Sequence, residues 1–265
     1  MNSFIKSIIN LIWAKKNFKF FVKNNINFKQ KNDMQKMINS LSYENNIRPI
    51  DIKIPENKKI LVIAPHPDDE TLGCGGLLIQ AADNNCNIHI LSLTSGSPTE
   101  QEKREAELQL AANQIGIKGI TFLRLTDGKI CNEIQQKNYL TDICEKFTPN
   151  IILTPFLFDH HLDHVCANKL FLESLDNINA EIWCYQVYNN ILSNAYCNIT
   201  KVIDKKTKII NSYKSQTKFF DYAHWNKGLN AWNSRLGLSK EHKYIESFFI
   251  SPKEDFIEMC KKYFL

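Results

Sequence analysis

The sequence lacks any apolar run long enough to cross a bilayer, since a membrane-spanning helix needs about 20 such residues. The apolar stretch near its start covers only residues 4–13. Lys15 and Lys16 follow this stretch, at the place where a signal peptide has a small-residue cleavage site. We therefore expect neither a transmembrane helix nor a secretory signal, and we expect a cytoplasmic protein.

No CxxC pair occurs among the eight cysteines. Structural zinc sites usually present two such closely spaced pairs, so a cysteine-ligated metal is not expected. Most of the cysteines lie in apolar patterns such as residues 182–185. We expect them to be small buried hydrophobic side chains of a protein that works in a reducing compartment.

Acidic side chains are absent from residues 1–32, which hold seven lysines. Without these lysines the formal net charge falls from +5 to −2, so the rest of the chain lacks the basic surface of a nucleic-acid-binding domain. The start of this segment predicts an amphipathic helix whose apolar face holds Ile5, Ile8, Ile9, Ile12 and Trp13. Basic residues with interleaved aromatics suit an anionic membrane surface, and packing on the protein itself or on a partner is the open alternative.

From about residue 59 onward, apolar runs alternate with helical patterns, which is typical of βαβ units. The patterns predict strands over 59–64, 87–94, 120–125, 151–154 and 181–188, and helices over 70–84, 97–115, 132–147 and 162–175. Further along, residues 205–219 look helical, and residues 221–238 look like a lid or a substrate loop. The expected fold is α/β: a Rossmann-like three-layer αβα sandwich with a mostly parallel sheet, plus an N-terminal helical extension. We divide the chain into an extension over 1–50 and a catalytic domain over 51–265.

The GxGxxG spacing of a dinucleotide-binding loop is also absent. Gly73, Gly75 and Gly76 fall inside the helix predicted over 70–84. Close packing of that helix on the sheet explains these glycines better than a phosphate-binding loop does.

Chemistry-bearing residues do follow the first predicted strand. His66, Asp68 and Asp69 come directly after the apolar run 60–64, so one imidazole and two adjacent carboxylates lie at the end of a buried strand. A His-Pro pair is usually a turn, and an Asp-Asp pair before a helix is usually an N-cap. This half of the pattern alone is therefore weak evidence for a site.

A second cluster, Asp159–His164, follows the apolar run 151–154 and also opens a predicted helix. Open α/β sheets place their sites at the carboxyl ends of the strands, so we expect the two clusters to meet there. Two such clusters in matching positions are much harder to obtain by accident than either alone. Together they predict a metal-dependent hydrolase.

The motif His66-Pro67-Asp68-Asp69 and the motif His161-Leu162-Asp163-His164 resemble those of the PIG-L/LmbE family. Members of that family are zinc-dependent enzymes that remove the acetyl group from N-acetylglucosamine (GlcNAc)-type sugars. The resemblance implies that His66, Asp69 and His164 are the metal ligands. Two imidazoles and a carboxylate suit Zn²⁺, and Fe²⁺ or another divalent ion is an open alternative.

The resemblance also implies roles in the reaction. Asp68 would be the general base that takes a proton from the attacking water. His161 would stabilise the oxyanion and protonate the leaving amine, and Asp163 would hydrogen-bond the His161 imidazole. Leu162 stands where many relatives carry proline. If the loop register shifts by one residue, His160 takes the role given to His161.

Two further residues, Arg104 and Asp127, match places where relatives build the sugar pocket. The equally weighted alternative for Arg104 is an ion pair with Glu100 or Glu107 on its own helix. In the late segment, Trp225 would suit a sugar ring as an aromatic platform, although ordinary packing is the stronger interpretation.

We therefore expect a metal-dependent de-N-acetylase that acts on a small-molecule or lipid-linked amino sugar. The basic extension favours a lipid-linked substrate and peripheral membrane contact through residues 1–32. The alternatives are an amidase that acts on a soluble thiol–sugar conjugate and a membrane-peripheral binding protein with a vestigial site. No nucleic-acid partner is expected.

Overall fold

The computed structural model describes residues 48–172, 174 and 178–264. The expected extension over 1–50 lies almost entirely outside these residues, so its helix and its boundary stay predictions. No helix among the described residues is both long enough and apolar enough to span a membrane.

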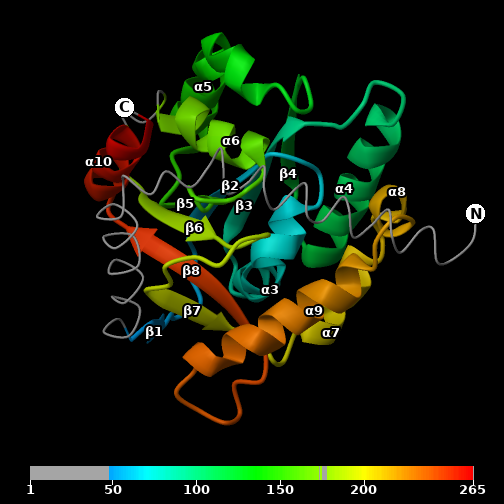
Figure 1. Cartoon of the computed structure of the whole chain (residues 1–265), viewed down its shortest axis with the longest axis vertical. Coiled ribbons are helices and arrows are strands. Elements are labelled where there is room, and N and C mark those ends of the chain that lie inside the picture. The colour runs from blue at the N-terminus through cyan, green and yellow to red at the C-terminus, as the bar shows by residue number, and fades with distance from the viewer. Residues whose placement is uncertain (1–47, 173, 175–177, 265) are drawn as a thin grey trace, which may run out of the picture. The chain divides into compact units, whose positions relative to one another are not determined.

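Eight strands of the described chain form one mixed, mostly parallel sheet (Figure 1). In spatial order β1-β7-β8-β6-β5-β2-β3-β4, only β8 runs antiparallel to its neighbours. The strands are β1 (Ile50–Asp51), β2 (Lys59–Ala64), β3 (Asn87–Thr94), β4 (Gly119–Leu125), β5 (Ile151–Pro155), β6 (Glu181–Tyr185), β7 (Ala195–Asn198) and β8 (Ile245–Ser251). The five strands expected from the sequence are all present, whereas β1, β7 and β8 were not expected.

Helices cover both faces of the sheet, which confirms the expected α/β fold (Figure 1). One face carries α3 (Asp69–Asp83), α4 (Gln101–Ile115), α7 (Ile203–Ile210) and α9 (Tyr222–Asn233), and α8 (Lys214–Thr217) contacts α4 and α9. The other carries α5 (Lys137–Phe147), α6 (Leu162–Leu172) and α10 (Lys253–Phe264). Successive side chains of a strand point to opposite faces of the sheet, so the sheet separates two hydrophobic cores. In β2, Ile60 and Val62 pack with the first set of helices, and Leu61 and Ile63 pack with the second.

The chain reverses its direction of travel across the sheet between β2 and β5. It runs from β2 outward to β3 and β4, and then returns to place β5 on the other side of β2. Ligand sites in open α/β sheets lie at such a switch point, outside the carboxyl ends of the two strands. The two sequence motifs follow β2 and β5, so the topology brings them together there.

A buried ion pair supports a kink in α3, where Cys74 departs from helical geometry. Glu246 of β8 accepts a hydrogen bond from the backbone N–H of Gly76, and Lys206 donates to the Leu72 carbonyl 2.9 Å away. The two charges meet at 2.8 Å with almost no exposed surface. They satisfy backbone groups that the kink would otherwise leave without partners in the core.

Three expected helices differ from those in the structure. The helix expected over 132–147 begins at Lys137, because the residues before it form a 3-10 segment, η3 (Ile130–Gln136). The helix expected from 97 begins at Gln101, because the Glu100 N–H bonds the Ser97 carbonyl and closes a separate turn first. The helix expected over 205–219 is divided into α7 and α8, and the Tyr213 side chain between them reaches to Glu70.

The expectation of a loop over 221–238 is wrong, because this segment forms α9 followed by a short 3-10 helix, η4 (Ser234–Leu236). The Asp221 carboxylate caps α9 by accepting from the His224 N–H. Three of the four buried positions on the helix are asparagines, each with a hydrogen-bond partner from another element. The hydrophobic pattern of the sequence therefore did not indicate this helix, since its buried positions are mostly polar instead of apolar.

The expectation that every cysteine is unpaired is wrong for Cys131 and Cys166, which form a disulfide with their Cα atoms 4.9 Å apart. The bond joins α6 to the 3-10 segment η3 (Ile130–Gln136). A pair separated by 35 residues has no local sequence signature. The other six cysteines are free, and all of them except Cys86 are buried as expected.

The close packing expected for the glycines of α3 is confirmed. A Cβ atom at Gly73 would lie 2.1 Å from Cδ2 of Tyr185, whose hydroxyl is held by a hydrogen bond to the Ile63 carbonyl. The tyrosine ring therefore has little freedom to move away.

We predict that Gly73→Ala lowers the free energy of unfolding by about 1–3 kcal/mol, because overpacking outweighs the better helix propensity of alanine. Gly228→Ala is the matched control, since a Cβ atom there meets nothing within 4 Å on α9. It should raise the free energy of unfolding by about 0.5–1 kcal/mol. Urea unfolding of both variants checks this, and equal effects would contradict the packing argument.

Candidate active site

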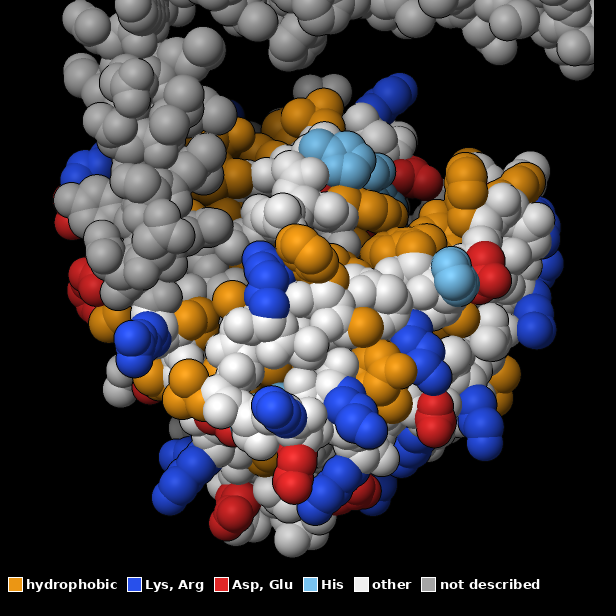
Figure 2. Space-filling model, turned by 60° about the horizontal axis from the view of Figure 1, so that its bottom comes forward, with side chains coloured by type: hydrophobic (Ala, Val, Ile, Leu, Met, Phe, Trp, Pro, Cys, Tyr) orange, Lys and Arg blue, Asp and Glu red, His pale blue; other side chains and the backbone are white. Residues whose placement is uncertain are grey.

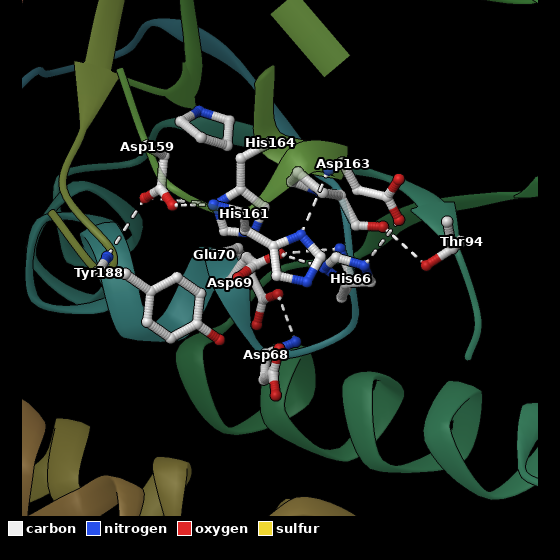
Figure 3. Close-up of polar contacts among 12 residues, drawn as sticks. His66, Asp68, Asp69, Glu70, Thr94, Asp159, His161, Asp163, His164 and Tyr188 are labelled. Atoms are coloured by element: carbon white, nitrogen blue, oxygen red, sulfur yellow. Dashed lines mark hydrogen bonds and ion pairs between the residues drawn. The ribbon is translucent and has the colours of Figure 1, made fainter. Parts of the chain in front are cut away.

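The candidate site collects side chains that follow the ends of β2, β4, β5 and β6. Figure 3 shows those of the two motifs together with Tyr188. His66 to Asp69 follow β2, and the cluster Asp159–His164 lies between β5 and α6. Asp127 comes after β4, and Tyr188 comes after β6. All four strands are parallel, so their carboxyl ends open on the same edge of the sheet.

The three expected metal ligands lie in direct contact. Oδ2 of Asp69 is 3.1 Å from Nδ1 of His66 and 3.2 Å from Nε2 of His164. All three side chains are buried. Although burial opposes ionisation of Asp69, the imidazoles of His164 and His66 hold its pKa well below the usual range.

The ring nitrogens of His164 support a cation here. They lie 3.2 Å from Asp69 and 3.5 Å from Asp159, yet neither nitrogen makes a geometrically sound hydrogen bond. A fully buried polar atom without such a bond needs another partner, and a divalent cation supplies one.

Other side chains widen the choice of ligands around the same place. Ligand atoms of His66, His161 and His164 lie within 4.8 Å of one another, and so do those of His66, Asp127 and Asp163. His66 belongs to both sets. The imidazoles and carboxylates therefore offer a mixed N/O environment of the kind that zinc and iron accept.

Asp68 is held in a strained backbone conformation, with φ at 128°. Such a conformation is rare for a residue other than glycine and costs about 1–3 kcal/mol. The Asp68 side chain does not cap α3, although the residue occupies the N-cap position. Burial and the neighbouring Asp69 carboxylate raise the pKa of Asp68 to about 8, while the Arg104 guanidinium opposes the shift.

Glu70 stabilises this conformation, and sequence reasoning gave it no role. Its Oε2 accepts a hydrogen bond from the Asp68 N–H at 3.1 Å, and its Oε1 accepts from the hydroxyls of Thr71 and Tyr213. Burial raises the pKa of this carboxyl. The tyrosine lies 143 residues away, so only the fold reveals the contact.

Arg104 faces the site instead of its own helix. Its Nη2 donates to the Pro67 carbonyl at 3.1 Å and lies 3.8 Å from Oδ2 of Asp68. The alternative of a pair with Glu100 or Glu107 is wrong, because those carboxylates bind Lys218 and Ser215. Arg104 is therefore placed to influence Asp68, since it is buried beside it.

Asp127 and Asp163 both reach Nε2 of His66, at 3.1 and 3.2 Å. The expected role of Asp163 is corrected in one respect: its backbone N–H, and not its carboxylate, hydrogen-bonds the His161 imidazole. The Asp163 carboxylate accepts from the Gly128 N–H at 2.7 Å, and this backbone donor draws it toward the loop after β4. Asp127 lies in the same loop, and its side chain is 38% exposed, so solvent reaches its carboxylate.

His161 lies among the other imidazoles, with ring centroids 4.8 Å from His66 and 4.9 Å from His164. Its Nδ1 accepts from the Asp163 N–H, so the neutral ring carries its proton on Nε2. Burial and the two neighbouring imidazoles lower the pKa of His161. His160 instead binds Asn189 at 3.0 Å and is exposed, so the structure brings His161 to the cluster.

Asp159 is a second residue that sequence reasoning left without a role. Its carboxylate accepts from the backbone N–H groups of His161 at 2.9 Å and Tyr188 at 3.3 Å, and lies 3.5 Å from Nδ1 of His164 (Figure 3). A carboxylate behind an imidazole fixes the orientation of a metal-binding histidine. The signal was present, since Asp159 opens the second motif.

Tyr188 forms one wall of the site, and its ring stacks on His164 with centroids 5.6 Å apart. Trp225 lies 6.0 Å further along, between Tyr188 and Tyr222. Trp225, for which ordinary packing was the stronger interpretation, therefore lies next to the aromatic wall of the site. His224 is exposed on α9.

Three comparisons place these features among known proteins. The family described as PIG-L, GlcNAc-PI de-N-acetylase, matches residues 61–175, which include both motifs. Diacetylchitobiose deacetylase of Thermococcus kodakarensis is 26% identical over 80% of this chain and 91% of that protein. A probable N-acetyl-alpha-D-glucosaminyl L-malate deacetylase 2 of Bacillus subtilis is 26% identical over 60% of this chain and 83% of that protein.

A solved structure shows the same fold. N,N'-diacetylchitobiose deacetylase from Pyrococcus horikoshii superimposes with a TM-score of 0.64, covering 82% of this chain and 92% of that one. The two sequences are 21% identical, so this likeness concerns the fold alone.

We predict that Asp159→Asn weakens Zn²⁺ affinity by about 10- to 100-fold. The asparagine side-chain oxygen still accepts a hydrogen bond from a backbone N–H, but the negative charge behind His164 is lost. His160→Ala, a change at the adjacent exposed imidazole, should leave the affinity unchanged. Competitive titration with a chromophoric chelator measures both variants. Unchanged affinity in Asp159→Asn would remove the role given to this carboxylate.

Proposed function

Because residues 61–175 match the PIG-L family, we propose that the protein is a metal-dependent hydrolase that removes the N-acetyl group of a GlcNAc-type sugar. The observation that carries the proposal is the contact of two imidazoles with Asp69, beside Asp68, whose backbone is strained. The names of the relatives from Thermococcus kodakarensis and Bacillus subtilis, both deacetylases of GlcNAc-containing compounds, support the same reaction.

In this proposal His66, Asp69 and His164 hold the metal, and the unbonded Nε2 of His164, which lies beside Asp69, supports that assignment. Two nitrogens and one carboxylate oxygen suit Zn²⁺, while Fe²⁺ fits the same donors. When bound, such a metal polarises the amide carbonyl and makes water more acidic.

Asp68 acts as the general base. Its carboxylate takes a proton from the attacking water. Glu70 fixes the backbone of Asp68, and Arg104 keeps a positive charge beside it. Water oxygen bonds to the carbonyl carbon, the C–N bond breaks, and acetate and a free amine leave.

His161 acts on the oxyanion and the leaving group. Its Nε2–H donates to the negative oxygen that forms in the transition state. As the C–N bond breaks, the amine nitrogen receives the proton that Asp68 took from water. Asp163 contributes indirectly, since its carboxylate holds His66 and its backbone N–H orients His161.

Asp127 is better placed than Arg104 to bind the sugar. Its partly exposed carboxylate accepts hydrogen bonds from sugar hydroxyls at the opening of the site. Arg104 is nearly fully buried against Pro67, and it contributes to the substrate site by positioning that turn.

We predict that Asp68→Asn lowers the rate of acetate release by about 10²- to 10⁴-fold while the bound metal remains, because the variant loses only the base. Asp83→Asn is the matched control, an exposed carboxylate at the other end of α3. Acetate is measured with free, nucleotide-linked and lipid-linked GlcNAc. Metal-loaded protein that releases acetate from none of them would favour a binding role.

Peripheral membrane contact through residues 1–32 is a separate proposal, which rests on the seven lysines and interleaved aromatics of this segment. We predict that deletion of residues 1–32 abolishes cosedimentation with vesicles that contain anionic lipid, because the electrostatic attraction is lost. Activity on a soluble substrate should not change. Equal sedimentation of both proteins would remove the basis for a lipid-linked substrate.

A further inference from the structure

A groove beside the catalytic cluster has no part in the reaction as described above. It has a volume of about 330 Å³ and lies between the segment after β6 and the helix α9. We call it the aromatic groove, and its lining residues are Val187, Tyr188, Phe220, Tyr222, Trp225 and Leu229. Figure 2, which views the molecule from the side of α9, shows hydrophobic side chains gathered around a hollow on this side.

The aromatic groove is continuous with the catalytic cluster. Tyr188 belongs to both, because its ring stacks on His164 and also lines the groove. Tyr222 also borders both, since it lines the groove and packs beside Asp68 around a gap too small to hold water. A substrate whose acetamide group lies between Asp68 and His161 would therefore extend directly into the groove.

The rings of the groove form a connected surface. Trp225 lies 6.0 Å from Tyr188 with an interplanar angle of 34°, and 5.5 Å from Tyr222. The apolar face of a pyranose ring packs on such aromatic faces. The Tyr188 and Tyr222 side chains, which hydrogen-bond each other, add polar atoms at the edge that suit sugar hydroxyls. This arrangement suits a flat ring with a polar rim better than it suits a flexible chain.

The groove offers no charge to an anionic group, since none of its six lining residues is charged. Two lysines on the neighbouring helical segments have partners elsewhere: Lys218 lies 3.4 Å from Glu100, and Lys227 lies 3.1 Å from Asp204. Anionic groups such as malate or a diphosphate are bound by cations and oriented N–H donors, so they do not match this lining.

We propose that the aromatic groove binds a second, uncharged sugar ring that is glycosidically linked to the GlcNAc-type residue undergoing deacetylation. This inference rests on the proposed function and narrows its substrate class to neutral di- or oligosaccharides. The second ring contributes to binding and positioning, and the groove residues take no part in the proton transfers.

The test compares acetate release from four GlcNAc compounds: a methyl glycoside, a disaccharide with glucose, an octyl glycoside and a malate glycoside. Only one N-acetyl group is present in each, so the acetate has one source. The disaccharide should exceed the methyl glycoside in kcat/KM by roughly tenfold, the size expected of one aromatic stacking contact.

Trp225→Ala should remove this advantage and leave kcat/KM for the methyl glycoside unchanged. Trp232→Ala is the matched control, because it is a tryptophan of the same helix whose side chain is 61% exposed and lies under Arg235 outside the groove. It should leave both values unchanged. Circular dichroism and thermal unfolding of the two variants check that α9 remains folded.

Equal loss of activity on the methyl glycoside and the disaccharide in Trp225→Ala would overturn the proposal. A larger gain from the octyl group, also lost in Trp225→Ala, would assign the groove to an alkyl chain instead of a sugar. Preference for the malate glycoside would overturn the uncharged class. No acetate from any compound would contradict the proposed function. The role of the groove would then be decided by calorimetry, which measures binding of the disaccharide to metal-loaded Asp68→Asn protein with and without Trp225→Ala.

Discussion

The contact of the Asp69 carboxylate with two buried imidazoles is the constraint on which the rest of the site depends. Charged groups are expensive to bury unless they are paired, and here each partner comes from a different strand end. The contact therefore requires β2 and β5 to be neighbours with their carboxyl ends level. The topological switch between these two strands supplies that arrangement, and Asp159 completes it from behind His164.

Polar contacts in the core carry this constraint outward to the helices. Glu70 connects the strained turn at Asp68 to Tyr213 between α7 and α8, while Lys206 and Glu246 support the kink of α3. Asn230 on α9 hydrogen-bonds the Lys206 ammonium. The helix that bears Trp225 is thus fixed through buried hydrogen bonds to the helix that begins with Asp69. Buried polar networks of this kind specify one arrangement, because each unsatisfied member is costly.

The site consequently divides into a charged part and an apolar part that meet at Tyr188. The charged part collects three imidazoles and several carboxylates, and it is suited to hydrolysis of an amide. The apolar part is lined by rings and aliphatic side chains, and it is suited to recognition of the rest of the substrate molecule. Chemistry and specificity are therefore carried by separate elements, the β2 and β5 ends for the first and α9 for the second.

The sequence by itself determined the alternation of strands and helices, the two motifs and the residue types that meet at the site. These features are local, since strand period, helix period and motif spacing act over a few residues. Tertiary structure alone decided that Asp163 turns to His66 and Gly128, that Asp159 orients His164, and that Cys131 pairs with Cys166. It also decided that α9 is a helix, because its buried asparagines find partners only on distant elements. Contacts between residues tens of positions apart depend on which strands become neighbours, and local patterns do not encode that choice.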